Sequence, residues 1–297
     1  MTSISIITPS YNQGRYIERT ILSVLSQPVA DMEYVVVDGA SKDETVDILK
    51  KYEDRLRWVS EKDSGQPEAV NKGLRMTDGE IIGWVNSDDV YYPDALPQVV
   101  AYFDAHPEVD VLYGKANIID ENDCEVEPYP TEPWNFERFK NDCYISQPAA
   151  FLRRRMVERF GYLVHEYHYT LDYEYWLRLA LGGAVFQYLP VVLAGARIYP
   201  ETKTISGKLS LHYEMNGMMI RKFGRVPDRW LFNFGHAYLY QHNMPRSHRF
   251  RFAVAVSAVS LWAALRWNKR ISRDMLATTY HWIAGNARAT LKEKLQR

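Results

Sequence analysis

Residues 80–89 read EIIGWVNSDD, an apolar run that ends in two adjacent carboxylates. The part Ile81–Val85 has the composition of a fully buried β-strand. Asp88 and Asp89 follow it after two further polar residues. Neighbouring carboxylates repel each other, and burial at a strand end adds a desolvation cost, so a cation or a set of donors is expected between them. The stretch therefore predicts a polar site at the end of a buried strand.

The same arrangement recurs along the first third of the chain. Runs of β-branched and apolar residues alternate with apolar residues at helical spacing, which predicts an α/β fold with a mostly parallel sheet covered on both faces. Ligands bind such sheets beyond the carboxyl ends of the strands. The predicted strands are Ser3–Thr8, Glu33–Val37, Leu56–Ser60 and Glu80–Val85, and the polar clusters that follow them are TPSYN (8–12), DG (38–39), EKD (61–63) and NSDD (86–89).

This predicted ligand edge is rich in carboxylates and lacks a glycine-rich phosphate loop. Neither G-x-G-x-x-G after the first strand nor G-x-x-x-x-G-K-[ST] occurs, which argues against dinucleotide dehydrogenases and P-loop enzymes. An acidic edge can still hold a diphosphate when a divalent cation bridges the charges. The sugar-phosphate nucleotidyltransferases also combine a metal ion with an α/β sheet. This enzyme class would need a glycine-rich loop after the first strand, which TPSYNQGRY does not supply.

Six segments in a fixed order span roughly the first 205 residues. They are TPSYNQGRYIERTILSVLSQ (8–27), VVVDGASKDETVDILKKY (35–52), SEKDSGQPEAVNKG (60–73), GEIIGWVNSDD (79–89), and QPAAFLRRRMVERFGYL with LDYEYWLRLA (147–163 and 171–180). As an ordered set they resemble the family 2 glycosyltransferases, inverting enzymes with the Rossmann-like GT-A fold. The resemblance implies a nucleotide-diphosphate-sugar donor, UDP- or dTDP-type, and a glycan or lipid-linked acceptor in bacterial surface polysaccharide synthesis.

The resemblance also implies the residues of the donor site. Thr8, Pro9 and Tyr11 would line the nucleotide, and Asp38 would contact the base. Asp88 and Asp89 occupy the D-x-D-type position, where Asp89 would ligate Mg²⁺ or Mn²⁺ and Asp88 would lie at the metal and the ribose or sugar. The remaining implied donor contacts are Asp63, Asn71, Lys72, Asn86 and Arg197. Asn86 stands where a longer acidic motif often begins, so this version has one carboxylate fewer.

An inverting transfer needs a base that takes the proton from the acceptor hydroxyl. The family places this carboxylate just ahead of a helix, where LDYEYWLRL supplies Asp172, with Glu174 as the fallback. Asp is also a favoured helix N-cap, so Asp172 has a structural alternative.

Other residues also keep two interpretations. Asp63 fits a solvated turn as well as a donor contact, and Arg197 fits a surface position as well as a clamp on the leaving diphosphate. Ser41 with Glu44 has the pattern of a capping box, which predicts a helix start there.

The last part of the chain differs in charge from the rest. Residues 203–297 contain 17 Lys and Arg against four Asp and Glu, a net +13, whereas the first 202 residues carry a net −14. Helices are predicted over about 207–223, 228–242, 247–267 and 271–294. The run Phe252–Leu265 is too short to span a bilayer, which needs about 20 apolar residues. It fits a helix packed on the catalytic domain or a peripheral membrane contact with basic residues at anionic headgroups.

These patterns predict two parts. Residues 1–205 form the catalytic domain, with nucleotide-sugar binding at about 1–115 and the acceptor side at about 116–205, and 206–297 form a basic helical region. No nucleic-acid module accompanies the basic charge, so nucleic acid is not an expected partner. Two cysteines and an N-terminus without a signal-peptide pattern predict a cytoplasmic chain, with the inner face of the plasma membrane as an open alternative. A catalytically silent nucleotide-sugar-binding module is the remaining alternative function.

Overall fold

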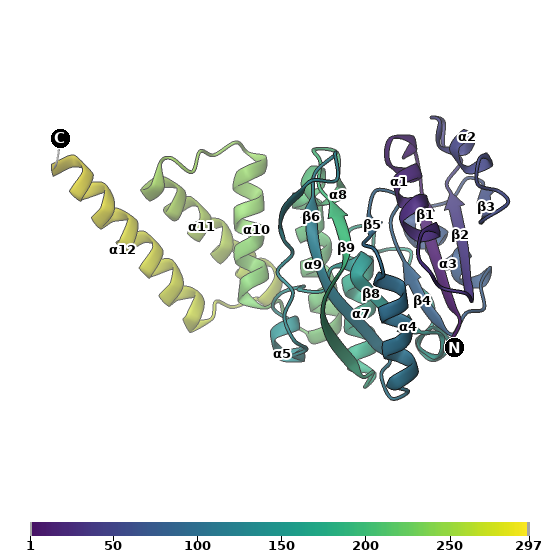
Figure 1. The fold of residues 1–297 in the computed structure, drawn as a ribbon. Coiled ribbons are helices and arrows are strands. Elements are labelled where there is room, and N and C mark those ends of the chain that lie inside the picture. The colour runs from purple at the N-terminus through teal and green to yellow at the C-terminus, as the bar shows by residue number, and fades with distance from the viewer. Residues whose placement is uncertain (1, 296–297) are drawn as a thin grey trace. The chain divides into compact units, whose positions relative to one another are not determined.

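The computed structural model describes residues 2–295 and separates into two compact units (Figure 1). The sheet unit comprises residues 1–139 and 143–200, and the helical unit comprises residues 140–142 and 201–297.

The sheet unit begins with four parallel strands joined by helices, as the alternating sequence pattern predicted. Three of these strands are largely buried, because helices cover the sheet, whereas the edge strand β3 is partly exposed. The parallel strands are β1 (Ile4–Ser10), β2 (Met32–Asp38), β3 (Arg57–Ser60) and β4 (Ile81–Trp84), and the helices between them are α1 (Gly14–Leu25), α2 (Thr45–Lys50) and α3 (Gln66–Arg75).

The second half of the sheet is mixed rather than parallel. Strand β8 joins β4 antiparallel, and β6 and β9 run parallel to each other beyond it, which gives a nine-stranded sheet in the order β3-β2-β1-β4-β8-β6-β9-β5 with β7 beside β6. These elements are β5 (Val90–Tyr91), α4 (Ala95–Ala105), β6 (Val111–Ile119), β7 (Glu125–Pro128), α5 (Phe136–Phe139), the 3₁₀ turn η1 (Gln147–Ala149), β8 (Ala150–Arg153), α6 (Arg154–Phe160), α7 (Leu171–Leu181) and β9 (Phe186–Arg197). Figure 1 shows β6 and β9 side by side.

Close packing fixes the helices on the sheet. A Cβ at Gly73 of α3 would lie 2.4 Å from the side chain of Ile7 on β1, so only glycine lets the helix approach this strand so closely. The predicted helix start at Ser41 is wrong, because α2 begins at Thr45 and Ser41 turns back to the end of β2. Asp43 lies at this start, where its carboxylate accepts hydrogen bonds from the backbone N–H groups of Thr45 (3.1 Å) and Gly14 (2.9 Å).

The helical unit confirms the helices predicted for the basic region. Its packing is closest where α10 crosses α11, because a Cβ at Gly235 would lie 2.3 Å from the Ser260 hydroxyl. The helices are α8 (Lys203–Ser206), α9 (Lys208–Phe223), α10 (Asp228–Gln241), α11 (Arg249–Asn268) and α12 (Arg273–Leu295).

Candidate active site

The loop between β4 and β5 holds the paired carboxylates at the carboxyl end of the parallel strands. Asp88 is half-buried and Asp89 is 6% exposed. Asn86 links the loop together, since its amide donates to Asp89 Oδ2 (3.1 Å) and its carbonyl oxygen accepts from Gln66 on α3 (2.7 Å). The predicted donor residues Asn86, Asp88 and Asp89 therefore share one loop.

Asp89 is buried beside another carboxylate, a position that disfavours its charged form. Burial raises the pKa of its carboxyl well above the ordinary value, and the neighbouring charge of Asp88 raises it further. The backbone N–H of Arg197 donates to Asp89 Oδ1 at 2.8 Å and offsets part of this effect. A cation at this loop would favour the charged form of both carboxylates.

The end of β9 fixes this loop from the other side. The Arg197 guanidinium is fully buried, donates to the carbonyl oxygens of Asp88 and Asp120 (both 2.7 Å) and pairs with Asp123. Tyr199 donates its hydroxyl to Asp88 Oδ2 at 2.8 Å. Tyr199 was not among the predicted site residues, because no pattern within a single sequence pairs the end of β9 with the loop after β4.

A second group of predicted donor residues surrounds Gly39 at the end of β2. A Cβ at Gly39 would lie 3.1 Å from Asp63 Oδ2 and 3.3 Å from the ring of Tyr11, so both side chains approach this glycine. Tyr11 is 60% exposed, which leaves its ring available for stacking. Burial raises the pKa of the Asp63 carboxyl, and the charges of Glu68 and Asp38 add to the shift. The Asp63 carboxylate accepts from the backbone N–H of Gly65 at 2.9 Å.

Asp38 lies at the same edge, but its carboxylate is fully buried and bonded within the protein. It accepts from the backbone N–H of Ser41 (2.9 Å) and from the hydroxyls of Ser41 and Ser60, the latter at 2.5 Å. These serines were not among the predicted site residues, although the three-residue spacing of Asp38 and Ser41 is a turn signal. Thr8 is likewise buried, with its hydroxyl 3.1 Å from that of Tyr34.

The other predicted donor residues have structural partners. The side chain of Asn71 exchanges two hydrogen bonds with the backbone of Leu163 (2.8 and 2.9 Å), and Lys72 forms an ion pair with Glu61. Pro9 is a buried residue of β1. Asn71 thus ties α3 to the segment that precedes α7.

Helix α7 carries both candidates for the base. The alternative interpretation of Asp172 as the N-cap is wrong, because Thr170 holds that position and Asp172 is the second residue of the helix. Trp176, one turn further on the same face, stacks on Trp84 at the end of β4 with ring centroids 5.5 Å apart. Asp172 therefore shares a face of α7 with Trp176, the residue that contacts the end of β4.

Glu174 faces elsewhere. It is 3% exposed and forms an ion pair with Arg178 at 3.0 Å, one turn along the helix. Its charge is therefore balanced by Arg178 within the protein.

The donor set at the β4–β5 loop fits a hard divalent cation. Carboxylate oxygens suit Mg²⁺ and Mn²⁺, and Mg²⁺ usually binds through one or two carboxylates together with substrate phosphates. Among the residues that the structure describes, no group of three or more His, Cys, Asp and Glu side chains forms a complete metal site. Two adjacent carboxylates fit the first arrangement, in which phosphates of a substrate supply further ligands.

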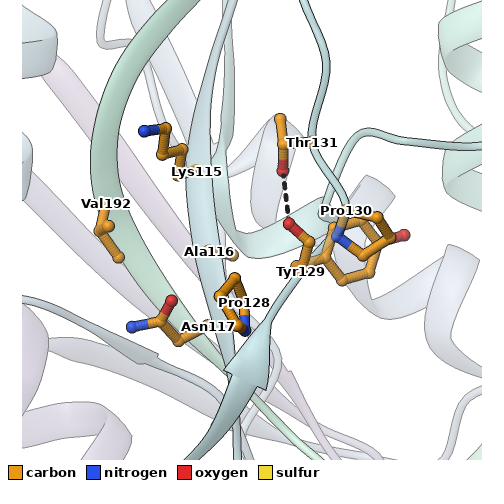
Figure 2. Close-up of a pocket in the computed structure, with 8 residues that line it drawn as sticks. All are labelled: Lys115, Ala116, Asn117, Pro128, Tyr129, Pro130, Thr131 and Val192. Atoms are coloured by element: carbon orange, nitrogen blue, oxygen red, sulfur yellow. Dashed lines mark hydrogen bonds between the residues drawn. The ribbon is translucent and has the colours of Figure 1, made fainter.

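A groove also opens on the sheet unit beside β6 (Figure 2). Among the described residues that line it, none is a predicted donor contact. The lining residues are Lys115, Ala116, Asn117, Pro128, Tyr129, Pro130, Thr131 and Val192.

Comparison with known proteins defines the class of this chain. The family model "Glycosyl transferase family 2" matches residues 5–161, more than half of the sequence. The chain belongs to this family, as the ordered segments predicted.

Individual relatives agree with this assignment. An uncharacterized glycosyltransferase of Rickettsia felis is 28% identical over 226 residues, which cover 71% of this chain and about a third, 36%, of that protein.

Solved structures show the same fold. Residues 1–349 of Staphylococcus aureus TarS, in complex with UDP-GlcNAc, align with 99% of this chain and 92% of that one at a TM-score of 0.62 and 18% identity. The mannosyltransferase PcManGT of Pyrobaculum calidifontis, in complex with GDP-Man and Mn²⁺, aligns with 96% of this chain and 84% of that one at a TM-score of 0.60 and 19% identity. The predicted α/β fold of GT-A type with a C-terminal helical extension is confirmed.

Proposed function

We propose that the chain is an inverting, divalent-metal-dependent glycosyltransferase that moves one sugar from a nucleotide-diphosphate-sugar to a hydroxyl of a glycan or lipid-linked acceptor. The observation that supports the proposal is the stacking of Trp176, one turn from Asp172 on α7, on Trp84 of β4, the strand that leads to the paired carboxylates Asp88 and Asp89. A base and a diphosphate-binding pair at one strand end are the two parts that such a transfer needs. We place this activity in the cytoplasm, in the synthesis of bacterial surface polysaccharide.

The donor would bind across the carboxyl ends of β1, β2 and β4. The exposed Tyr11 ring offers a stacking surface for the base, and Asp63 offers a carboxylate beside it that can accept from a ring N–H. Asp38, whose carboxylate already accepts from Ser41 and Ser60, would hold the loop that carries Gly39. That TarS and PcManGT are described with UDP-GlcNAc and GDP-Man supports a nucleotide-sugar donor.

Asp89 and Asp88 would hold Mg²⁺ or Mn²⁺, and the bound ion would neutralise charge on the donor diphosphate. Arg197 would act on this loop rather than on the diphosphate, because its guanidinium is bonded to Asp88, Asp120 and Asp123. The Mn²⁺ in the PcManGT complex supports a divalent ion in this fold.

Asp172 would act as the general base. The acceptor oxygen attacks the anomeric carbon from the face opposite the diphosphate, its proton passes to the Asp172 carboxylate, and the bond to the diphosphate breaks with its electron pair. Attack from the opposite face inverts the anomeric configuration.

A panel of UDP-, dTDP- and GDP-sugars, with Mn²⁺, with Mg²⁺ and with EDTA, tests the proposal. We expect release of the nucleoside diphosphate from a small subset of donors, only with a metal ion. Proton NMR of the first product, including sugar transferred slowly to water, should show the inverted anomer. Retention of configuration, or equal turnover in EDTA, would contradict the proposal, and no release from any donor would favour the silent binding module.

A further inference from the structure

The basic helical unit plays no part in the proposed chemistry, yet its helix α11 has an unusual outer face. Four apolar residues lie exposed on it at spacings of four, four and three: Val254 (39% exposed), Ala258, Trp262 (50%) and Leu265 (51%). At 3.6 residues per turn this spacing forms one stripe along the helix. We call these four residues the outer stripe of α11.

Packing inside the helical unit fixes which way the outer stripe faces. The opposite side of α11 is buried, and its Ser260 lies against Gly235 of α10 so closely that a Cβ at Gly235 would clash. Ala253, Val256 and Ala264 on this side are also buried. The stripe is therefore exposed because α10 packs against the opposite side of α11, and only part of the stripe, the Trp262 ring, also reaches Phe234 of α10 (ring centroids 6.1 Å apart).

Basic residues flank the outer stripe of α11 at both of its ends. Arg251 falls on the same helical face three residues before the stripe, and Lys269 is the C-cap residue four residues after it. Exposed Arg249, Arg266, Arg270 and Arg273 lie beside these ends. Between residues 243 and 288 the sequence has eight Lys and Arg and a single acid, Asp274. The partner of this face must therefore be anionic as well as apolar.

We propose that the outer stripe of α11 docks the chain on an anionic lipid surface. Aliphatic and indole side chains enter the headgroup boundary of a bilayer, while arginine and lysine meet anionic headgroups at its surface. A second copy of the chain is a poor partner, because it would bring two sets of these cations together. Nucleic acid satisfies the cations and leaves the stripe in water.

The contact is with the membrane surface rather than through the membrane. Within residues 2–295, α11 is the one helix that is long enough and apolar enough to cross a bilayer, judged by length and composition alone. One third of its most apolar 18-residue window is buried in the protein. Crossing would require α11 to leave α10 and expose Ser257 and Ser260, both buried, to lipid. Lying flat keeps this face on α10 and presents the stripe.

Vesicle co-sedimentation of the full chain tests the inference independently of catalysis. We compare phosphatidylcholine vesicles with and without phosphatidylglycerol, at low and high salt. Wild type should bind the anionic vesicles, and salt should weaken the binding. Each basic residue near an anionic surface contributes about fivefold, so the triple variant with Arg266, Arg270 and Arg273 changed to Glu should lose at least tenfold.

Two further variants separate charge from burial. The control with Lys50, Lys51 and Arg55 changed to Glu has the same change in net charge on the sheet unit, and it should bind as wild type does. The variant Trp262→Ser with Leu265→Ser should also lose at least tenfold, because about half of each side chain is exposed. The Trp262 ring also lies against Phe234 of α10, so a thermal melt of the variant checks that its fold is kept.

Several results would overturn the inference. Equal binding by wild type and the triple variant would remove the charge contribution. An unchanged Trp262→Ser, Leu265→Ser variant would reduce the face to an anion-binding surface without lipid insertion. Resistance of the wild-type protein to carbonate extraction would mean that α11 crosses the bilayer. A dimer that the serine variant abolishes would assign the stripe to self-association.

Discussion

The sheet unit and the helical unit of this chain place their charges in opposite ways. The sheet unit keeps charged groups inside, where Asp89 and Arg197 are buried at the ends of the strands and are held by specific hydrogen bonds. The helical unit carries its arginines and lysines outside, around an exposed apolar stripe. Buried charges in the sheet unit bear on the chemistry of the candidate site, and exposed charges in the helical unit bear on the kind of surface that the chain can bind.

The same contrast appears in the buried ionisable groups. Burial raises the pKa of Asp89 in the sheet unit, where a cation would restore the charged form. In the helical unit burial lowers the pKa of His212 to about 4, with Lys208 adding to the shift, and this His belongs to the core between helices. The comparison predicts that substitutions in the first unit change activity and that substitutions in the second change stability or location.

The largest effect is expected at Asp172. Asp172→Asn should lower kcat by roughly 10²–10⁴-fold, the usual loss for a general base, and leave donor binding unchanged. Glu174→Gln is the matched control on the same helix, since Glu174 is paired with Arg178. It should lower the melting temperature and leave kcat within a few-fold of wild type. Steady-state rates of nucleoside diphosphate release measure both, and a reversed order would move the base to Glu174.

The next effect concerns the pH dependence of the helical unit. The pKa of His212 falls from its ordinary value to about 4 on folding, so the folded state binds fewer protons than the unfolded state between about pH 6.5 and 4. The stability from neutral His212 is complete above pH 6.5 and is lost as the pH falls to 4, by up to about 3 kcal/mol. His212→Gln should show a smaller loss in urea melts across this range. An equal loss in both proteins would contradict the burial argument.

Two glycines in the helical unit test its packing. Gly235→Ala should destabilise by about 1–3 kcal/mol, because the new Cβ meets Ser260 at the crossing of α10 and α11. Gly217→Ala on α9 is the matched control, since a Cβ there has no atom within 4 Å, and it should stabilise by up to about 1 kcal/mol. Thermal melts measure both changes, and both variants should transfer sugar to a soluble acceptor at the wild-type rate. Shifts of the same sign would mean that the crossing is not tight.

The smallest effect is expected at Tyr199. Tyr199→Phe removes the hydrogen bond to Asp88 and should lower kcat/KM by about tenfold. Tyr16→Phe is its control, because the Tyr16 ring contacts that of Tyr199 with centroids 4.9 Å apart while its hydroxyl donates to Glu121 at 3.2 Å. The control should keep kcat/KM within about twofold of wild type. Equal losses in the two variants would show that the aromatic pair matters and the bond to Asp88 does not.

The sequence predicted what depends on periodicity and missed what depends on tertiary pairing. The four parallel strands and the four long helices of the basic region follow from runs and spacings in the chain. Ser41 was predicted as a helix cap because the pattern of a capping box is local, yet its hydroxyl bonds to Asp38 at the strand end. The part played by Tyr199 depends on where β9 lies relative to the loop after β4, and no local pattern carries that information.

The candidate site divides in the same way. A polar site at Asp88 and Asp89 could be predicted from the sequence, because two adjacent carboxylates repel each other and need a cation or donors nearby. The residues alone do not decide between Asp172 and Glu174, since both lie near the start of one helix, and only the family resemblance favoured Asp172. The stacking of Trp176 on Trp84 and the ion pair of Glu174 with Arg178 depend on tertiary contacts that no local pattern of the sequence predicts.

The central claim is that the carboxylates after β4 bind the donor diphosphate through a divalent ion. Calorimetric titration with the nucleoside diphosphate that the donor panel selects, in Mn²⁺ and in EDTA, tests it on wild type and Asp89→Ala. We predict that EDTA weakens binding to wild type by at least tenfold and that Asp89→Ala binds equally weakly in both conditions. Affinity in Asp89→Ala that still depends on Mn²⁺ as strongly as in wild type would contradict the claim.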